Sequence, residues 1–178
     1  MARVAERLGV TTMALYRHVA DRDDLERAVV ELVLADLAGF APGAGDWQSG
    51  IAGWMHALRR CWIAHPWVAS MLGTRSELSP SWLAAIDRLT AMLFDSGLPP
   101  EEAAHEAVLI SRTTVGLLWL EVSAPLPHTG LTEAAMAHLP SSVWPRWRQL
   151  AEGLQSYGND DLFNDLVTQT LTRLREVC

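Results

Sequence analysis

The stretch Val-Ala-Glu-Arg-Leu-Gly-Val-Thr-Thr-Met-Ala-Leu-Tyr-Arg-His-Val, residues 4–19, decides the fold of this chain. Val4, Ala5 and Leu8 fall on one face of a short helix. Gly9 can end that helix, because glycine adopts the left-handed backbone conformation at little cost. The residues after the glycine again have helical spacing, so we expect a helix-turn-helix.

The second helix of this motif follows residues that can cap it. Thr11 or Thr12 can accept a hydrogen bond from a first-turn amide, and Leu15 and Val19 lie four residues apart on the inward side. The side chains left near the N-terminus of this helix or on its outer face are Thr11, Thr12, Met13, Ala14, Tyr16, Arg17 and His18. Threonine and alanine can contact a thymine methyl group, arginine can bind guanine, and tyrosine, histidine and arginine can hold phosphates. The motif therefore indicates DNA binding.

This string resembles the DNA-binding part of TetR-family transcriptional regulators, and Arg22-Asp23-Asp24-Leu25 continues the resemblance. Looser similarity to the C-terminal domain of the tetracycline-repressor branch extends over nearly the whole chain. The resemblance implies a DNA-binding head with its connecting helix, residues 1–38, and a ligand-binding and dimerisation body, residues 39–178. It also implies that side chains from Thr12 to His18 contact bases or phosphates, and that Arg22 binds a phosphate.

The head is expected to be truncated. TetR-family heads have a further helix before this motif, and Met1 falls inside the part that matches their second helix. We expect the true start to lie upstream, since two helices alone leave Val4, Leu8 and Leu15 with part of their apolar cover missing. A head of this size is predicted to be marginally stable.

Charge is distributed unevenly along the chain. The net charge is −7 over 178 residues, yet residues 1–22 contain four arginines, including Arg3, against two acidic residues. A slightly basic head can contact phosphates while an acidic body is kept away from DNA. The charge pattern is therefore typical of a protein in which only the head binds nucleic acid.

Helical patterns continue through the rest of the chain without a convincing strand, so we predict an all-α fold. Residues 101–123 are apolar on two sides, which predicts that one side is covered by a partner. The candidate partner-facing residues of this helix and of the helix at 159–176 are Val108, Val115, Leu118, Phe163, Leu166, Thr170 and Leu174. The TetR resemblance implies that these helices form a four-helix homodimer interface, which would place two recognition helices roughly 34–36 Å apart.

Five of the eight tryptophans lie between positions 47 and 82. Apolar side chains that share a helical face or could line the same space are Trp54, Leu58, Trp62 and Met71. This cluster predicts either a ligand pocket or ordinary core packing. The tetracycline-repressor resemblance places Thr74 and Arg75 beside the pocket, but Met71 and Trp54 stand where that branch has a metal-coordinating histidine and a ligand-anchoring asparagine. We expect an apolar or aromatic ligand and no metal or cofactor.

Nothing in the sequence favours an enzyme or a membrane protein. Glu102-x-x-His105 matches half of a di-iron site, but such a site needs a second copy and further carboxylates. Cys61 and Cys178 give no zinc spacing or disulfide framework, so Cys61 is expected to be a buried, inert thiol. There is no uncharged apolar run of about 18 residues and no signal peptide before the motif. We expect a cytoplasmic protein without a membrane partner.

Together these patterns predict a homodimeric transcriptional regulator, a repressor that an apolar or aromatic small molecule releases from double-stranded operator DNA. Release requires the ligand to bind the free geometry more tightly than the operator-bound geometry. The alternative is a dimeric ligand-binding helical protein whose DNA-binding head is incomplete.

Overall fold

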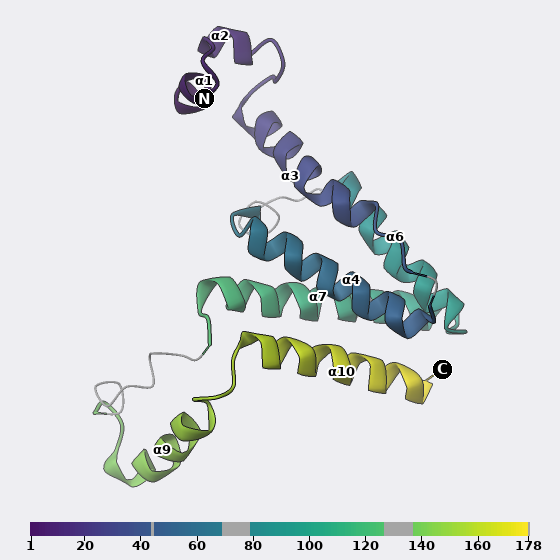
Figure 1. The fold of residues 1–178 in the computed structure, drawn as a ribbon, viewed down its shortest axis with the longest axis vertical. Coiled ribbons are helices and arrows are strands. Elements are labelled where there is room, and N and C mark those ends of the chain that lie inside the picture. Colours follow the sequence, from purple (N-terminus) through teal and green to yellow (C-terminus); the bar gives the residue numbers. More distant parts are fainter. Residues whose placement is uncertain (44, 69–78, 127–136, 178) are drawn as a thin grey trace.

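The computed structural model describes residues 1–43, 45–68, 79–126 and 137–177. All regular structure in these residues is helical, which confirms the predicted fold class. In chain order the elements are α1 (Ala2–Leu8), α2 (Thr12–Leu15), α3 (Arg22–Ala38), α4 (Trp47–Ala64), α6 (Pro80–Asp95), α7 (Pro100–Ser123), the 3₁₀ turn η1 (Ser141–Val143), α9 (Trp144–Gly153) and α10 (Asn159–Val177). Figure 1 shows α1 and α2 at the end of an arm formed by α3, and α9 standing away from the packed body.

The predicted helix-turn-helix is present, and local hydrogen bonds define its corner. Gly9 ends α1 with φ of 67°, and the N–H of Val10 donates to the carbonyl oxygen of Ala5 at 3.0 Å. Thr11 caps α2, because its Oγ1 accepts a hydrogen bond from the N–H of Ala14 at 3.2 Å. These contacts join neighbours in sequence, so the corner is determined locally.

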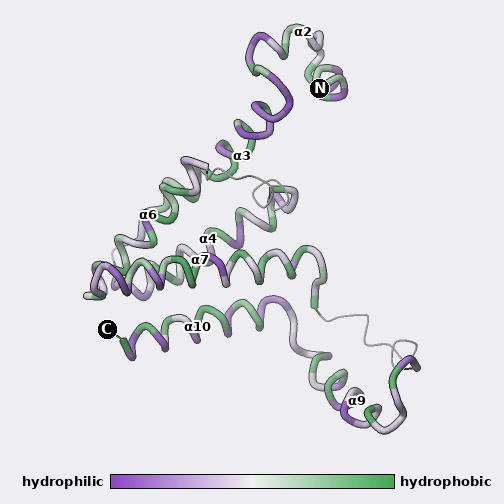
Figure 2. The backbone as a smooth tube through the Cα atoms, turned by 180° about the vertical axis from the view of Figure 1, so that it is seen from behind, coloured by the Kyte–Doolittle hydropathy of each residue, from purple (hydrophilic) through white to green (hydrophobic). Residues whose placement is uncertain are grey.

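Helix α3 connects the head to the body. It begins at Asp21, whose Oδ1 accepts a hydrogen bond from the N–H of Asp24 at 2.7 Å. Figure 2 shows that its first turns are hydrophilic, where it lies outside the body. Further along, Leu34 is fully buried and the Glu31 carboxylate accepts a hydrogen bond from the N–H of Ser81 in α6 at 2.9 Å. This hydrogen bond links α3 to α6, so a displacement of α6 would also displace α3 and the head that α3 carries.

The body is built around one apolar core to which α3, α4, α6, α7 and α10 all contribute. Its largest fully buried side chains are Leu34, Ile51, Trp54, Met55, Leu58, Trp62, Leu89, Leu93, Ile110, Leu118, Phe163 and Leu174. Burial of side chains of this size contributes about 1.5–3 kcal/mol each to folding before the entropy cost. The core therefore holds α4, α7 and α10 in fixed positions under the arm of α3.

Candidate functional site

The residues predicted to meet DNA form the outer surface of α2 and of the turn after it. Met13 has 73% of its surface exposed, and Tyr16, Arg17 and His18 are exposed as well. Thr12 and Ala14 are half-buried. The exposed side chains include an apolar thioether, a phenol, a guanidinium and an imidazole, which together can contact bases and phosphates.

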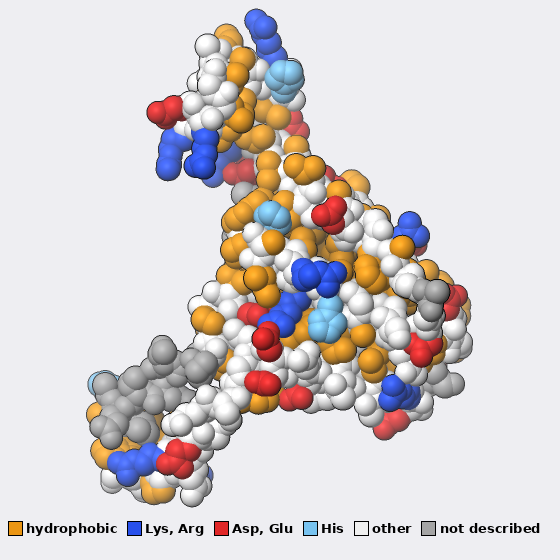
Figure 3. Space-filling model, in the orientation of Figure 1, with side chains coloured by type: hydrophobic (Ala, Val, Ile, Leu, Met, Phe, Trp, Pro, Cys, Tyr) orange, Lys and Arg blue, Asp and Glu red, His pale blue; other side chains and the backbone are white. Residues whose placement is uncertain are grey.

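The other predicted DNA contacts are arranged around this surface. Arg3 is exposed on α1, and Thr11 is exposed, with its hydroxyl oxygen already accepting the capping hydrogen bond of α2. Arg22 begins α3, where its Nε donates to Oε1 of Glu26 at 2.7 Å, and this contact raises the pKa of the guanidinium. Figure 3 shows arginine side chains on more than one side of the protruding head. The head can therefore present positive charge to a duplex.

The predicted pocket residues that the structure describes lie in the core. Trp54, Leu58 and Trp62 are buried, and the Nε1 of Trp54 donates to the carbonyl oxygen of Ala85 at 2.9 Å. Met71, Thr74 and Arg75, the other predicted pocket residues, lie outside the described residues. The structure thus places Trp54 as a satisfied core side chain.

Three buried side-chain polar atoms lack a hydrogen-bond partner among the described residues. They are Nε1 of Trp62 in α4, and Oε2 of Glu106 and Oγ1 of Thr114 in α7. Leaving a buried donor unpaired costs about 1–3 kcal/mol, so such groups call for an explanation. Sequence reasoning selected Trp62 but not Thr114, because nothing in the spacing of α7 marks one threonine of Thr113-Thr114 as buried.

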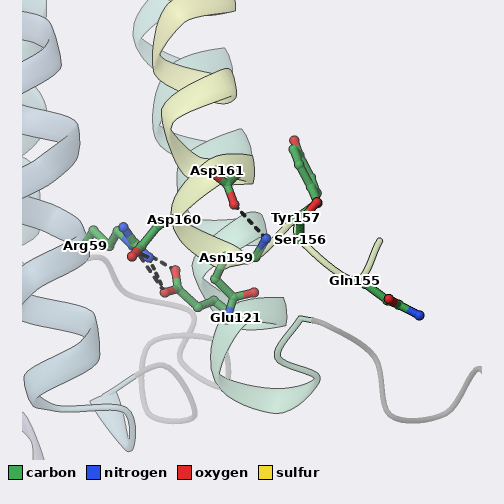
Figure 4. A pocket seen from close by; sticks show the side chains of 9 residues that line it. Arg59, Glu121, Gln155, Ser156, Tyr157, Asn159, Asp160 and Asp161 are labelled. Atoms are coloured by element: carbon green, nitrogen blue, oxygen red, sulfur yellow. Dashed lines mark hydrogen bonds and ion pairs between the residues drawn. The ribbon is translucent and has the colours of Figure 1, made fainter. Parts of the chain in front are cut away.

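A polar cavity of about 480 Å³ lies where α4, α7 and the start of α10 meet, and it was not foreseen from the sequence (Figure 4). The guanidinium of Arg59 points to two carboxylates there: its Nη2 lies 2.6 Å from Oε1 of Glu121 and 2.5 Å from Oδ1 of Asp160. The hydrogen bonds that Arg59 donates to the Glu121 carboxylate raise the pKa of the guanidinium. Asn159 on the same rim accepts a hydrogen bond from the N–H of Leu126. The polar groups of this cluster bond one another, so we assign it a structural role.

The predicted dimer-interface residues differ in how far a single chain buries them. Leu118, Phe163, Thr170 and Leu174 are buried inside a single chain, so the prediction that they face a partner is wrong for these four. Val115 and Leu166 are half-buried, and Val108 is exposed. The reason is that the side of α7 carrying Leu118 packs on α4 and α10. The large apolar side chains that α7 leaves exposed are Val108, Leu109, Trp119, Leu120 and Val122.

The other candidate site suggested by the sequence is the half di-iron motif in α7. Glu102 and His105, the half motif noted above, are both exposed. No three histidine, cysteine or acidic side chains converge as metal ligands within the described ranges. None of the described helices combines the length and apolar character needed to cross a membrane.

The sequence of this chain is similar to those of known transcriptional regulators. Residues 39–166 match the family described as "Tetracyclin repressor-like, C-terminal domain". An HTH-type transcriptional regulator of Saccharopolyspora erythraea is 27% identical over 116 residues, covering 65% of this chain and 49% of that protein. The HTH-type transcriptional repressor DrrR1 of Streptomyces coeruleorubidus is 26% identical over 137 residues, covering 75% of this chain and 51% of that protein. The chain thus spans about half the length of the curated relatives it matches.

Solved structures give the same result over more of the chain. A possible TetR family transcriptional regulator from Streptomyces coelicolor A3(2) superposes with a TM-score of 0.77 at 28% identity, covering 99% of this chain and 89% of that one. The Streptomyces coelicolor TetR family protein ActR in complex with actinorhodin gives a TM-score of 0.76 at 26% identity, covering 99% and 86%.

Proposed function

The chain belongs to the TetR family of transcriptional regulators, and we propose that it is a repressor that a small apolar or aromatic ligand releases from operator DNA. In this proposal residues 1–38 are the DNA-binding head and residues 39–178 the ligand-binding and dimerisation domain. The single observation that carries it is the helix-turn-helix at 4–19, whose second helix exposes Met13 and whose following turn exposes Tyr16, Arg17 and His18.

DNA binding is proposed to divide between base and phosphate contacts. Met13 and Arg17 would reach base edges in the major groove, while Tyr16, His18 and Arg22 would hold phosphates. Arg22 is suited to this because it is exposed and retains donors that Glu26 does not use. Removal of a base-reading arginine typically costs about 1–3 kcal/mol of binding free energy.

Dimerisation is proposed to use the exposed apolar face of α7. Leu109 and Leu120 lie on that face with Gly116 between them, and a Cβ built on Gly116 would meet no atom within 4 Å. A glycine at this point lets a second helix approach closely, and contact would bury large apolar side chains that are now exposed. A two-fold dimer would present two α2 helices to a near-palindromic operator.

Ligand binding is proposed for the centre of the body, close to Trp62 and Thr114. The N–H of Trp62 has no acceptor among the described residues and can only donate, so the ligand would offer a hydrogen-bond acceptor on an apolar framework. ActR, which shares this fold, has been crystallised with actinorhodin, and this supports a small-molecule ligand here. Because α3 is fastened to α6 through Glu31 and Ser81, a shift in the body would change the spacing of the heads.

A DNA-binding titration tests the proposal. Fluorescence anisotropy at fixed moderate salt would compare duplexes from the promoter beside the gene with a scrambled duplex, using the wild-type chain, Arg17→Ala and the control Arg88→Ala. Arg88 is exposed on α6, far from the head in sequence. We expect competitor-resistant binding that Arg17→Ala weakens by about 1–3 kcal/mol and Arg88→Ala leaves unchanged. Equal binding to promoter and scrambled duplexes would contradict the proposal.

Dimerisation and ligand binding have separate tests. In sedimentation equilibrium, Leu120→Glu should give monomers and Leu83→Glu should not; both residues are about half exposed, at 56% and 50%, but Leu83 lies on α6. Actinorhodin is the first ligand probe, and its dissociation constant, measured from quenching of the remaining tryptophans, should rise in Trp62→Phe, which keeps an aromatic ring but loses the N–H donor. A dimer in Leu120→Glu would refute the α7 interface.

A second candidate function is a dimeric ligand-binding protein with an incomplete head. It is favoured by the exposure of Val4, Leu8 and Val10 on the first helix and its turn, and by an apolar-sided hollow between α1 and α3. The same titration separates the two functions, because this candidate predicts ligand binding and dimerisation without sequence-specific DNA binding.

A further inference from the structure

We propose that Met13 reads the methyl group of a thymine in each operator half-site. This inference deepens the proposed function and rests on it, since it names the base feature that the α2 surface recognises. It starts from the exposure of Met13, whose side chain is 73% exposed and protrudes from the short second helix of the helix-turn-helix.

The position of Met13 is fixed by its neighbours in the chain. The Thr11 hydroxyl accepts a hydrogen bond from the N–H of Ala14, and the N–H of Tyr16 donates to the carbonyl oxygen of Thr12 at 3.3 Å. These bonds bracket Met13 and hold its Cα–Cβ direction outward. The half-buried Leu15 anchors the opposite side of the helix. Met13 therefore meets whatever the helix docks on, with little reordering of the backbone.

The chemistry of the side chain narrows what it can recognise. A thioether has no hydrogen-bond donor and is only a weak acceptor, so it cannot read the donors and acceptors of the base edges strongly. The apolar feature that distinguishes one base from the others in the major groove is the C5-methyl group of thymine. Arg17 and His18 are exposed and polar, which suits them to guanine and phosphates. Thr12 and Ala14 also carry methyl groups, but both are half-buried, so Met13 is the most exposed apolar side chain of α2 and the best placed to reach the methyl group.

Exposed apolar residues also occur singly on protein surfaces without a function. Leu32 in α3 is such a matched case, with 75% of its surface exposed at a position outside the helix-turn-helix. Comparison of Met13 with Leu32 separates a base contact from a general effect of removing surface apolar area.

The test removes one methyl group from the DNA and one side chain from the protein. Sites are first selected by the full chain from random duplex DNA, and each thymine of the selected site is then replaced by deoxyuridine, which keeps base pairing. Dissociation constants are measured for the wild-type chain, Met13→Ala, Met13→Leu and Leu32→Ala. Alanine favours helix, so far-UV circular dichroism should show that Met13→Ala keeps its helices.

We expect one thymine per half-site whose replacement weakens wild-type binding about fourfold, the value for losing contact with one methyl group. Met13→Leu and Leu32→Ala should keep this sensitivity, and Met13→Ala should lose it, as a double-mutant cycle requires. Tight wild-type binding without any thymine of this kind would overturn the inference and leave the proposed function intact. Failure to select any sequence would overturn both.

Discussion

Replacing Arg59 with methionine should destabilise the folded body by about 1.5–3 kcal/mol. The side chain of Arg59 is 13% exposed and that of its main partner Glu121 is 11% exposed. Nε and Nη2 of Arg59 both donate hydrogen bonds to the Glu121 carboxylate. Methionine keeps much of the volume but leaves the partly buried carboxylate without its cation. Loss of hydrogen bonds between charged groups has this magnitude, and it stays below the cost for a fully buried pair because Glu121 lines the cavity, where water can solvate it.

Two further contacts of Arg59 change the estimate little. Asp160 is largely exposed, and pairs with exposed groups contribute about 0–1 kcal/mol. The guanidinium also lies 4.7 Å from the ring centroid of Phe163, a cation–π contact that contributes about 0.5–2 kcal/mol. Most of the predicted loss therefore comes from Glu121.

Urea denaturation followed by tryptophan fluorescence, at one protein concentration because assembly shifts apparent stability, measures the loss. The double variant Arg59→Met/Glu121→Leu should recover most of it, since an apolar pair of similar volume is often as stable as a buried ion pair. Arg88→Met, at an exposed site on α6, is the control and should stay within about 0.5 kcal/mol of wild type. A single-variant loss below about 1 kcal/mol, or a double variant as unstable as the sum of the singles, would refute the reasoning.

Two other residues give predictions of a different kind. Burial and the nearby positive charge of Arg59 lower the pKa of His56. The unfolded chain therefore binds more protons than the folded chain below about pH 6.5, the pKa of a free histidine. The folded state should therefore lose stability as the pH falls from 8 to 5.5, and His56→Gln, measured by the same urea titrations, should lose less; an equal loss would contradict this. Burial raises the pKa of the Cys61 thiol, whose Sγ lies 3.5 Å from the carbonyl oxygen of Val33. In a Cys178→Ser background Cys61 should react with iodoacetamide much more slowly than free cysteine at pH 7.5, and reaction at the rate of the free thiol would show that it is open.

What the sequence predicted well depends on short-range interactions. Thr11, Asp46 and Ser79 each accept a hydrogen bond from the backbone N–H three residues later and so cap the start of a helix. Gly9 ends α1 in the left-handed conformation. Partners this close in sequence meet in any chain that folds locally, so residue type and spacing suffice.

The orientation of α7 is the point at which sequence reasoning failed. A helix that is apolar on two sides has no single preferred buried face, so its pattern could not tell Leu118, which is buried, from Leu120, which is exposed. The buried side chains of α10 had the same ambiguity, since a seam such as Phe163 and Leu174 can face its own core or a partner. The packing of α4 and α6 on α7, and of α4 and α7 on α10, decides which side chains are buried.

The sequence alone determined the helix-turn-helix and its exposed α2 surface, because these follow from neighbouring residues. Tertiary structure alone decided which polar groups meet in the body. Arg59 joins Glu121 and Asp160 from positions 62 and 101 residues away, and Thr114 is buried while the neighbouring Thr113 is exposed. Such pairings have no local signature, because they depend on how three helices pack around a shared apolar core.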